Sequence, residues 1–374
     1  MKILFTGGGT GGHIFPIIAV AREMRRSHPK NLEIFYLGPK DPFAKILLSQ
    51  EGIRVKSILS GKIRRYWNFI SFFQNIFDIL IKIPIGILQA FLYIFFLNPD
   101  SIFSKGGYGS IPVVIAGKLL GVPIFLHESD AVPGATNRFL ARFALEIFVS
   151  FPRTIYFAPQ KIILIGNPIR KEILEGSAEE AKEFFHIKGN RPVVLVLGGS
   201  QGAQRINDKI LEILPKFLRD FELIHQCGEK NYNEVKKESK VMMGKELERY
   251  HHLFPFLKEY ELKLAYAISD LIVARAGSGT IFEIAALGKP SILIPLPEAA
   301  QNHQLKNAYN YAKNGAAIVL EEKNFTPHFF LEKVRYLLSS PNELKKMSDA
   351  AKKFARPQAA KIIAEYLITF LTQH

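Results

Sequence analysis

The sequence predicts an α/β fold in which helices cover two mostly parallel sheets. Short β-branched or aromatic runs alternate with longer stretches of helical periodicity along the chain, which is typical of parallel strands joined by helices. Two series of this kind open in the same way, with an apolar strand that runs into a glycine-rich loop, at residues 2–12 and 193–203. The length of 374 residues also exceeds what one hydrophobic core usually supports. We therefore expect two α/β domains built on the same plan.

The first domain is expected to alternate strands and helices from its first residues. Each expected strand is a short apolar run that is followed by glycine, proline or polar residues. The strands are Ile3–Thr6, Glu33–Leu37, Ser101–Ser104, Ile124–Leu126, Ile147–Val149 and Ile162–Ile165, and the helices cover residues 14–27, 42–51, 110–120 and 135–143.

The second domain opens with Val193–Leu197, a β-branched-rich run of the kind found in buried parallel strands. Its other expected elements are the strands Leu223–Gln226, Leu271–Ala274, Ser291–Pro295 and Ala317–Val319 and a helix at 204–218. A strand meets a turn signal at Ile165–Pro168, so we place the boundary there and expect domains of residues 1–166 and 167–356. A last helix, about residues 357–372, has one apolar face that could pack on either domain.

The charge is positive and unevenly distributed. The formal net charge is +15, and residues 1–168 contain 19 Lys and Arg residues but only 9 Asp and Glu residues. This asymmetry indicates an anionic partner for the first half, namely nucleic acid, a phospholipid surface or a phosphorylated substrate. The single cysteine, Cys227, cannot form an internal disulfide and fits a reducing compartment. We expect no signal peptide, because a glycine loop follows the first short strand at once.

Residues 61–98 form an apolar and aromatic segment with a basic start. Its longest clean apolar run, Ile83–Leu97, is shorter than the roughly 20 residues that span a bilayer. Three interpretations stay open: a pair of core helices, a surface that dips into a membrane interface, and a spanning helix. The acid Asp78, together with Lys82 and Pro84, disfavours the spanning helix. At an interface, lipid phosphates would be contacted by Lys62, Arg64 and Arg65, with Trp67 at headgroup depth.

The loop Gly7–Gly12 joins the first strand to the first helix. Its glycines let the backbone turn tightly and let a ligand approach the N–H groups, and a helix N-terminus favours an anion. Gly7, Gly9 and Gly12 also fit a dinucleotide-binding pattern, but the second strand ends without the acid that would hold a ribose. A tight turn without a ligand is the third interpretation. His13, directly after the loop, is either a base beside the anion or a structural histidine.

Two further loops of the first domain are candidates for the same site. Gly106–Ser110 is a second junction of strand, loop and helix. His127–Asp130 follows a strand at its carboxyl end, which is the edge where open parallel sheets bind ligands. His127 and Glu128 are therefore expected either to do acid–base work or to cap the next helix. No His or Cys spacing fits a metal site, so we expect neither a metal nor a cofactor.

The second domain offers three comparable loops. They are the glycine loop Gly198–Ala203, the junction Arg275–Glu283 and the segment Ala300–Gln304, and each follows a predicted strand. A helix N-terminus with hydroxyls, a carboxylate one turn later and a nearby amide suit a phosphate, a ribose and a sugar. Together they favour a nucleotide-sugar over an adventitious anion.

Seven motifs in their order along the chain resemble the MurG family of glycosyltransferases. They are GGGTGGH-x-x-P, SKGGYGS, HES-x-x-x-x-G, GNP-x-R, GGSQGA, RAGSGT-x-x-E and NHQ-x-x-NA. The resemblance covers essentially the whole chain and implies a GT-B fold, that is, two Rossmann-like domains facing a cleft, with the last helix returning to the first domain. It also implies an N-acetylglucosaminyltransferase that acts on UDP-GlcNAc and lipid I, gives lipid II for peptidoglycan synthesis, and inverts the configuration at the transferred sugar.

The resemblance also implies the site residues by position. His13 matches the histidine often proposed as the base, and Glu128 is the other candidate. Arg170 matches a contact to the donor diphosphate, Glu283 a contact to the ribose, and Gln304 a contact to the sugar hydroxyls. The full set of expected substrate-binding residues is Thr10, Gly11, Gly12, Asp130, Arg170, Ser200, Leu257, Ser278, Gly279, Thr280, Ile281, Phe282, Glu283 and Gln304.

One position departs from the family pattern. The family usually has Asn where this chain has Asp130, in a contact to the donor sugar. A carboxylate accepts hydrogen bonds but cannot donate one unless it is protonated, so this contact is lost or reversed in sense.

The resemblance implies a membrane acceptor and no nucleic acid. The expected partners are UDP-N-acetylglucosamine, lipid I, an anionic membrane surface and cell-wall synthesis proteins, and the expected location is peripheral on the cytoplasmic face of the cell membrane. Two rival functions stay open: a UDP-sugar epimerase on the same fold, and a nucleotide-sugar-binding protein without catalysis. Neither rival explains both the apolar segment 61–98 and the candidate acid–base residues.

Overall fold

The computed structural model describes residues 1–8, 11–28, 31–62, 69–152, 155–199 and 202–373. The chain forms two compact units: Met1–Arg170 with the C-terminal segment from Pro357, and Lys171–Arg356. The boundary therefore lies after Arg170 and not after Gly166 as expected. Residues after Gly166 still contact the first unit: Asn167 Oδ1 accepts a hydrogen bond from Ser129 (3.1 Å), and the Arg170 guanidinium lies 4.2 Å from the centre of the Phe15 ring.

The first unit contains a seven-stranded sheet in the order β3-β2-β1-β4-β5-β6-β7, and all neighbouring strands are parallel. The strands are β1 (Lys2–Thr6), β2 (Glu33–Gly38), β3 (Arg54–Ser57), β4 (Ser101–Ser104), β5 (Ile124–Glu128), β6 (Glu146–Val149) and β7 (Ile162–Leu164). Strand β3, at the edge of the sheet, was not expected from the sequence.

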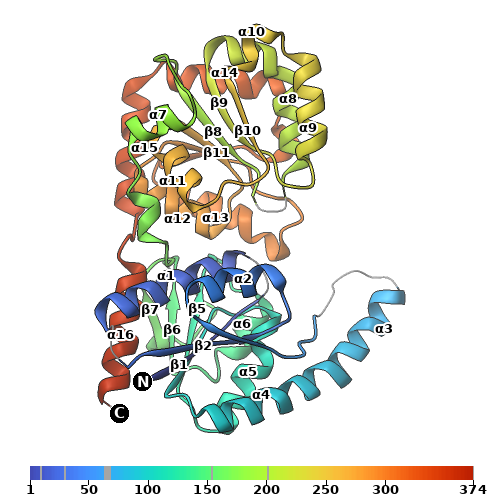
Figure 1. Cartoon of the computed structure of the whole chain (residues 1–374), viewed down its shortest axis with the longest axis vertical. Helices are drawn as coiled ribbons and strands as arrows, with labels where there is room; N and C mark the ends of the chain where they lie inside the picture. The colour runs from blue at the N-terminus through green and yellow to red at the C-terminus, as the bar shows by residue number, and fades with distance from the viewer. Residues whose placement is uncertain (9–10, 29–30, 63–68, 153–154, 200–201, 374) are drawn as a thin grey trace. The chain divides into compact units, whose positions relative to one another are not determined.

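Helices cover both faces of this sheet (Figure 1). Successive strand residues point to opposite faces, so Ile3 and Phe5 join one apolar cluster and Leu4 joins the other. The first cluster includes residues of α1 (Gly11–Ser27), α2 (Pro42–Gln50) and α16 (Ala359–Gln373), and the second includes residues of α4 (Ile83–Leu97), α5 (Ile111–Leu119) and α6 (Ala135–Leu140). The C-terminal helix α16 thus packs on the first unit, against α1.

The second unit contains a six-stranded parallel sheet in the order β10-β9-β8-β11-β12-β13. Its strands are β8 (Val193–Leu197), β9 (Glu222–Gln226), β10 (His251–Phe254), β11 (Leu271–Ala274), β12 (Ser291–Leu293) and β13 (Ala317–Val319). Its helices are α7 (Ala178–Phe184), α8 (Gln204–Asp220), α9 (Tyr232–Met242), α10 (Lys245–Glu248), α11 (Glu259–Ile268), α12 (Ser278–Leu287), α13 (His303–Ala312), α14 (Pro327–Leu338) and α15 (Pro341–Phe354). The edge strand β10 was also not expected.

A long apolar helical arm extends from the first unit (Figure 1). It consists of α3 (Phe69–Phe77), a π-helical turn η1 (Asp78–Lys82) and α4. Only a narrow stripe of α4 is buried, at Gly86, Ala90 and Ile94. A side chain at residue 86 would meet the carbonyl oxygen of Leu59 at 2.0 Å, so glycine permits this close contact. The interpretation as core helices is therefore correct for one face of α4, on which Phe91, Tyr93 and Leu97 also pack against the core, and wrong for the exposed face.

The arm is also longer than the sequence indicated. The segment Ser71–Leu97 has 27 residues and is long and apolar enough to cross a membrane by length and composition. The estimate from Ile83–Leu97 alone was too short, because the helix continues through η1. Asp78 is buried in this turn, where it accepts a hydrogen bond from the backbone N–H of Lys62 (3.1 Å) and pairs with Lys82 (2.6 Å). Arg64, Arg65 and Trp67 lie outside the described residues.

The packing of α16 predicts a clear contrast between two neighbouring isoleucines. Ile363 is fully buried in the cluster with α1, whereas Ile362 is 45% exposed. Ile363→Ala should lower the free energy of unfolding by about 2–5 kcal/mol, because it removes buried methyl groups and leaves a cavity. Ile362→Ala, the matched control, should change it by less than about 0.5 kcal/mol. Urea unfolding followed by circular dichroism measures both, and equal effects would contradict the docking of α16.

Candidate functional site

In the first unit, the candidate residues lie at the carboxyl edge of three adjacent strands. β1, β4 and β5 are neighbours in the sheet, with Thr6 opposite Ser104 and Ser104 opposite Leu126. Because the strands are parallel, the loops that follow them, beginning at Gly7, Lys105 and Ser129, start at the same edge. The fold therefore brings together three motifs that are far apart in the sequence.

His13 lies in the first turns of α1, which begins at Gly11 and not at residue 14 as expected. Its ring is held between two glycines: a Cβ on Gly8 would lie 3.2 Å from the ring, and a Cβ on Gly107 would lie 3.1 Å from Nε2. Burial, with a smaller effect of Lys105, lowers the pKa of His13 to about 4. The imidazole is therefore neutral at pH 7 and, in the unliganded protein, a weak base.

Glu128 is a buried carboxylate at the end of β5. Its Oε1 accepts a hydrogen bond from the backbone N–H of Asp130 (2.9 Å), and its Oε2 accepts one from the amide of Asn137 (2.8 Å). Burial, followed by the nearby charge of Asp130, raises the pKa of Glu128 to about 7. A general base is most effective when its pKa is close to the working pH, so Glu128 meets this requirement better than His13 does.

His127 is fully buried and has a structural position. Its Nε2 lies 3.0 Å from the carbonyl oxygen of Gly166, and because a carbonyl only accepts, Nε2 carries the proton. Its Nδ1 then accepts from Lys105 Nζ at 2.6 Å. Both ring nitrogens are therefore engaged, and of the expected pair of His127 and Glu128 only Glu128 is a candidate for acid–base work.

The remaining candidates of the first unit lie near α1 or outside the described residues. Gly11 and Gly12 open α1, where first-turn N–H groups favour an anion. Arg170 packs over Phe15 of the same helix and so belongs to this unit. Thr10, like Ser200 of the second unit, lies outside the described residues.

In the second unit, the helix α12 supplies the expected nucleotide-binding residues. It begins at Ser278, directly after β11 and the residues Arg275–Gly277. Among its first residues, Ile281 and Phe282 have fully buried side chains, so only their backbone can face a ligand. Ser278, Gly279 and Thr280 are the N-terminal residues whose N–H groups suit a phosphate.

The other three candidates of this unit are also held in place by local contacts. Glu283 Oε2 accepts a hydrogen bond from the hydroxyl of the buried Tyr266 (3.0 Å). Gln304 Oε1 accepts from the backbone N–H of Leu296 (3.0 Å), which uses the amide oxygen and leaves its NH₂ group for a sugar hydroxyl. Leu257 follows the edge strand β10 and buries its side chain.

Several residues that position these loops were not identified from the sequence. The buried Asn307 donates to the carbonyl of Ala276 (3.3 Å) and so ties α13 to the loop before α12. Arg275 pairs with Glu322 and donates to the carbonyl of Ile294 (3.2 Å). Asn137 and Lys105 play comparable parts in the first unit. Lys105, Arg275 and Asn307 lie within the motifs, but nothing in the sequence shows what their side chains contact.

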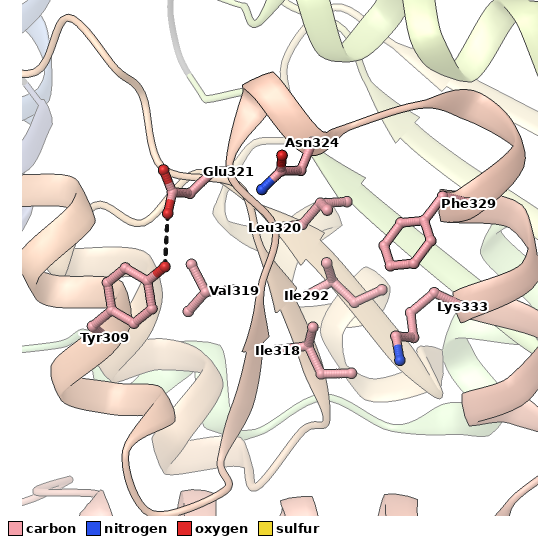
Figure 2. Close-up of a pocket in the computed structure, with 9 residues that line it drawn as sticks. All are labelled: Ile292, Tyr309, Ile318, Val319, Leu320, Glu321, Asn324, Phe329 and Lys333. Carbon is pink, nitrogen blue, oxygen red and sulfur yellow. Dashed lines mark hydrogen bonds between the residues drawn. The ribbon is translucent and has the colours of Figure 1, made fainter.

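A hollow at the outer edge of the second sheet is separate from these residues. It has a volume of about 180 Å³ and lies between α13, β13 and α14 (Figure 2). Tyr309 donates a hydrogen bond to Glu321 (2.7 Å) at its rim. No candidate site residue lines it. Among the residues that the structure describes, no group of three or more His, Cys, Asp or Glu side chains could hold a metal ion.

Comparison with known protein families identifies both units. Residues 3–149 match the glycosyltransferase family 28 N-terminal domain, and residues 193–363 match the family 28 C-terminal domain. A relative from Bacillus cereus is 37% identical over 98% of this chain and 99% of its own length; it is named UDP-N-acetylglucosamine–N-acetylmuramyl-(pentapeptide) pyrophosphoryl-undecaprenol N-acetylglucosamine transferase 2. A relative from Clostridium tetani with the same transferase name is 36% identical over 98% of this chain and 98% of its own length.

Solved structures agree with this assignment. MurG from Acinetobacter baumannii superposes with a TM-score of 0.73 at 26% identity and covers 98% of this chain and 99% of its own. UDP-GlcNAc 2-epimerase from Neisseria meningitidis, with a TM-score of 0.68 at 16% identity over 99% of this chain and 100% of its own, shows the fold alone. The expected fold of two parallel-sheet domains of the GT-B type is thus confirmed.

The enclosure of His13 predicts an unusual titration. The His13 imidazole should stay neutral from pH 8 down to about pH 4, because protonation would place a charge in a desolvated space beside Lys105. Nitrogen-15 NMR of labelled histidine, with His13→Asn to assign the signal, measures this directly. A His13 signal that titrates near its ordinary value of 6.5 would show that the ring is solvated.

Proposed function

The chain belongs to glycosyltransferase family 28, and on that premise we propose that it transfers N-acetylglucosamine from UDP-N-acetylglucosamine to the 4-hydroxyl of the N-acetylmuramyl sugar of lipid I, giving lipid II for peptidoglycan synthesis. The observation that carries the proposal is the combination, in one unit, of buried Glu128 with a long exposed apolar arm. An enzyme that acts on a soluble sugar alone has no use for such an arm, whereas a lipid-linked acceptor requires a membrane-facing surface.

The donor is assigned to the second unit. The N-termini of α8 and α12 offer N–H groups to the diphosphate, Glu283 accepts from the ribose hydroxyls, and the Gln304 amide donates to the sugar. The contacts of Tyr266 and Leu296 hold the last two side chains ready before the donor arrives. Arg170, whose position matches a contact to the donor diphosphate in the family pattern, is the last residue of this segment of the first unit.

The reaction that suits this site is a single displacement. The acceptor hydroxyl attacks the anomeric carbon, its proton passes to Glu128, the bond from that carbon to the diphosphate oxygen breaks, and configuration inverts from α to β. The fixed N–H groups stabilise the charge that grows on the departing UDP, and the loss of one such donor typically costs about 3 kcal/mol of the barrier. His13, neutral at pH 7, is a hydrogen-bond partner for the acceptor and does not take its proton.

The exposed arm is assigned to an anionic membrane surface. Large apolar side chains are exposed along it, among them Phe72, Leu80 and Phe96. In the same unit, a hollow of about 330 Å³ between the end of α5 and the segment before β6 is lined by Lys118, Arg142 and Lys161 together with apolar residues. Cations next to apolar surface are typical of peripheral binding to anionic lipid.

Peripheral binding fits the arm better than a complete crossing of the membrane. One stripe of α4 packs on the core of the unit, and the buried Asp78 is hydrogen-bonded to Lys62 of the preceding segment. A helix that is tied to the domain in this way leaves only its outer face to lipid. The proposed location is therefore the cytoplasmic face of the cell membrane, where the donor nucleotide is available.

The transfer assay tests the proposed chemistry. Purified enzyme with labelled UDP-N-acetylglucosamine and a lipid I analogue should form the lipid II analogue. Glu128→Gln should lower kcat at pH 7 by about 10²–10⁴-fold, the usual contribution of a general base, with little change in the KM for the donor. His13→Gln should cost less in kcat.

Other outcomes of this assay would contradict the account in different ways. A larger loss for His13→Gln than for Glu128→Gln would move the base to His13. Epimerisation of the donor, or binding without any turnover, would favour one of the two rival functions.

Vesicle sedimentation tests the membrane assignment. Leu80→Glu should weaken binding to vesicles containing phosphatidylglycerol by about tenfold or more, because it removes roughly 2 kcal/mol of apolar burial and adds repulsion. Val241→Glu, an exposed apolar position of the second unit, is the matched control and should have no effect. Salt should weaken the binding of the unmodified protein without abolishing it. Equal binding of both variants would contradict the assignment of the arm.

A further inference from the structure

Lys105 is a buried lysine at the centre of the proposed proton-transfer site. It directly follows β4, its side chain is 2% exposed, and its backbone N–H donates to the carbonyl of Thr6, at the start of the first loop (2.9 Å). Its ammonium group lies within hydrogen-bond distance of His127 Nδ1 (2.6 Å), Ser129 Oγ (2.5 Å) and Asn167 Oδ1 (3.5 Å). An ammonium has three N–H donors and no acceptor, so these three groups match it when it is charged.

The three partners of Lys105 all present hydrogen-bond acceptors, as a charged ammonium requires. His127 presents its unprotonated Nδ1, because its Nε2 donates to Gly166. The Ser129 hydroxyl accepts a hydrogen bond from Lys105 and donates one to Asn167 Oδ1 (3.1 Å). Each of these three partners is neutral, so the charges that compensate the buried ammonium must come from further away.

Two carboxylates supply that compensation. Burial lowers the pKa of Lys105 to about 7, and Glu128 at the end of β5 and Asp130 in the loop after it act against that lowering. The titratable groups that face this cluster are His13 from α1, His127 and Glu128 from β5, Asp130 from the next loop, and Lys105 itself. The two histidines are neutral near pH 7, so the charge of the cluster depends on Glu128, Asp130 and Lys105, and the three acceptors around Lys105 favour its ammonium form.

Asp130, which stands where the family usually has Asn, and Lys105 have opposite effects on the ionisation of Glu128. A second carboxylate beside Glu128 opposes its ionisation, whereas the Lys105 ammonium favours it. An asparagine at 130 with an uncharged residue at 105 would leave Glu128 with neither effect. Asp130 and Lys105 therefore act on the ionisation of Glu128 in opposite directions.

We propose that Lys105 is the positioning residue of the proton acceptor: it offsets the charge of Asp130 and fixes His127 and Ser129, so that Glu128 is ionised when the acceptor hydroxyl reaches it. This inference rests on the proposed function, in which Glu128 is the base. Lys105 itself touches no reacting atom; it acts through the charge and the geometry of its neighbours.

Variants that remove the charge of Lys105, of Asp130 or of both test the proposal. Lys105→Met should move the acid limb of the pH profile of kcat/KM upward, because a positive charge that favours ionised Glu128 is lost. Lys105→Gln, which keeps a hydrogen-bond donor without the charge, should give the same upward shift. Asp130→Asn should move the limb downward. The double variant Lys105→Met/Asp130→Asn should return it towards that of the unmodified enzyme.

A second readout keeps this test separate from the transfer assay. Carbon-13 NMR of labelled glutamate, with Glu128→Gln to assign the signal, follows the Glu128 carboxylate whether or not transfer occurs. Lys45→Met, which removes an exposed lysine from α2, is the matched control and should leave both the limb and the Glu128 signal unchanged.

The outcomes separate the two claims. A Glu128 titration that is the same in Lys105→Met, Lys105→Gln and the unmodified protein would overturn the role of Lys105, as would a double variant shifted as far as Lys105→Met alone. Shifts of the Glu128 titration in the expected directions without any transfer by the unmodified enzyme would support the role of Lys105 in ionisation and overturn the proposed function.

Discussion

The parallel orientation of every strand pair in both sheets is the constraint on which the candidate site depends. It places the loops after β1, β4 and β5 at one edge of the first sheet and those after β8, β11 and β12 at one edge of the second. Gly7, Lys105 and Ser129 are therefore neighbours in space although many residues separate them in the sequence. An antiparallel strand at any of these positions would send its loop to the opposite edge and remove one motif from the site.

The candidate site of the first unit contains buried ionisable side chains, and the surrounding residues stabilise them. His13 is enclosed between Gly8 and Gly107, where any larger residue would press on the ring. Glu128 accepts two hydrogen bonds, from Asp130 and Asn137, and three acceptors lie within hydrogen-bond distance of the Lys105 ammonium. A buried charge without such partners would cost several kcal/mol. The same desolvation that costs stability brings the pKa of Glu128 into the range that proton transfer near pH 7 requires.

The central strands could be predicted from the sequence, because strands that are covered on both faces are continuous apolar runs; Val193–Leu197 is fully buried, as its composition indicates. The edge strands β3 and β10 were missed because they are largely polar and half-exposed, so no apolar pattern marks them. The contacts of Lys105 were missed for another reason: they join residues 22, 24 and 62 positions away, and only the folded sheet brings these together. The boundary likewise depends on tertiary contacts, of Asn167 with Ser129 and of Arg170 with Phe15.

The central claim is that the donor nucleotide binds to the second unit while the proton acceptor stands in the first. Hydrogen–deuterium exchange with UDP, which lacks the transferred sugar, tests this most directly. The account predicts slower exchange at the start of α12 and in the segment around Leu257, and unchanged exchange in Gly7–His13 and at Glu128. Protection of the Gly7–His13 loop by UDP, with none at α12, would contradict the assignment of the donor nucleotide to the second unit.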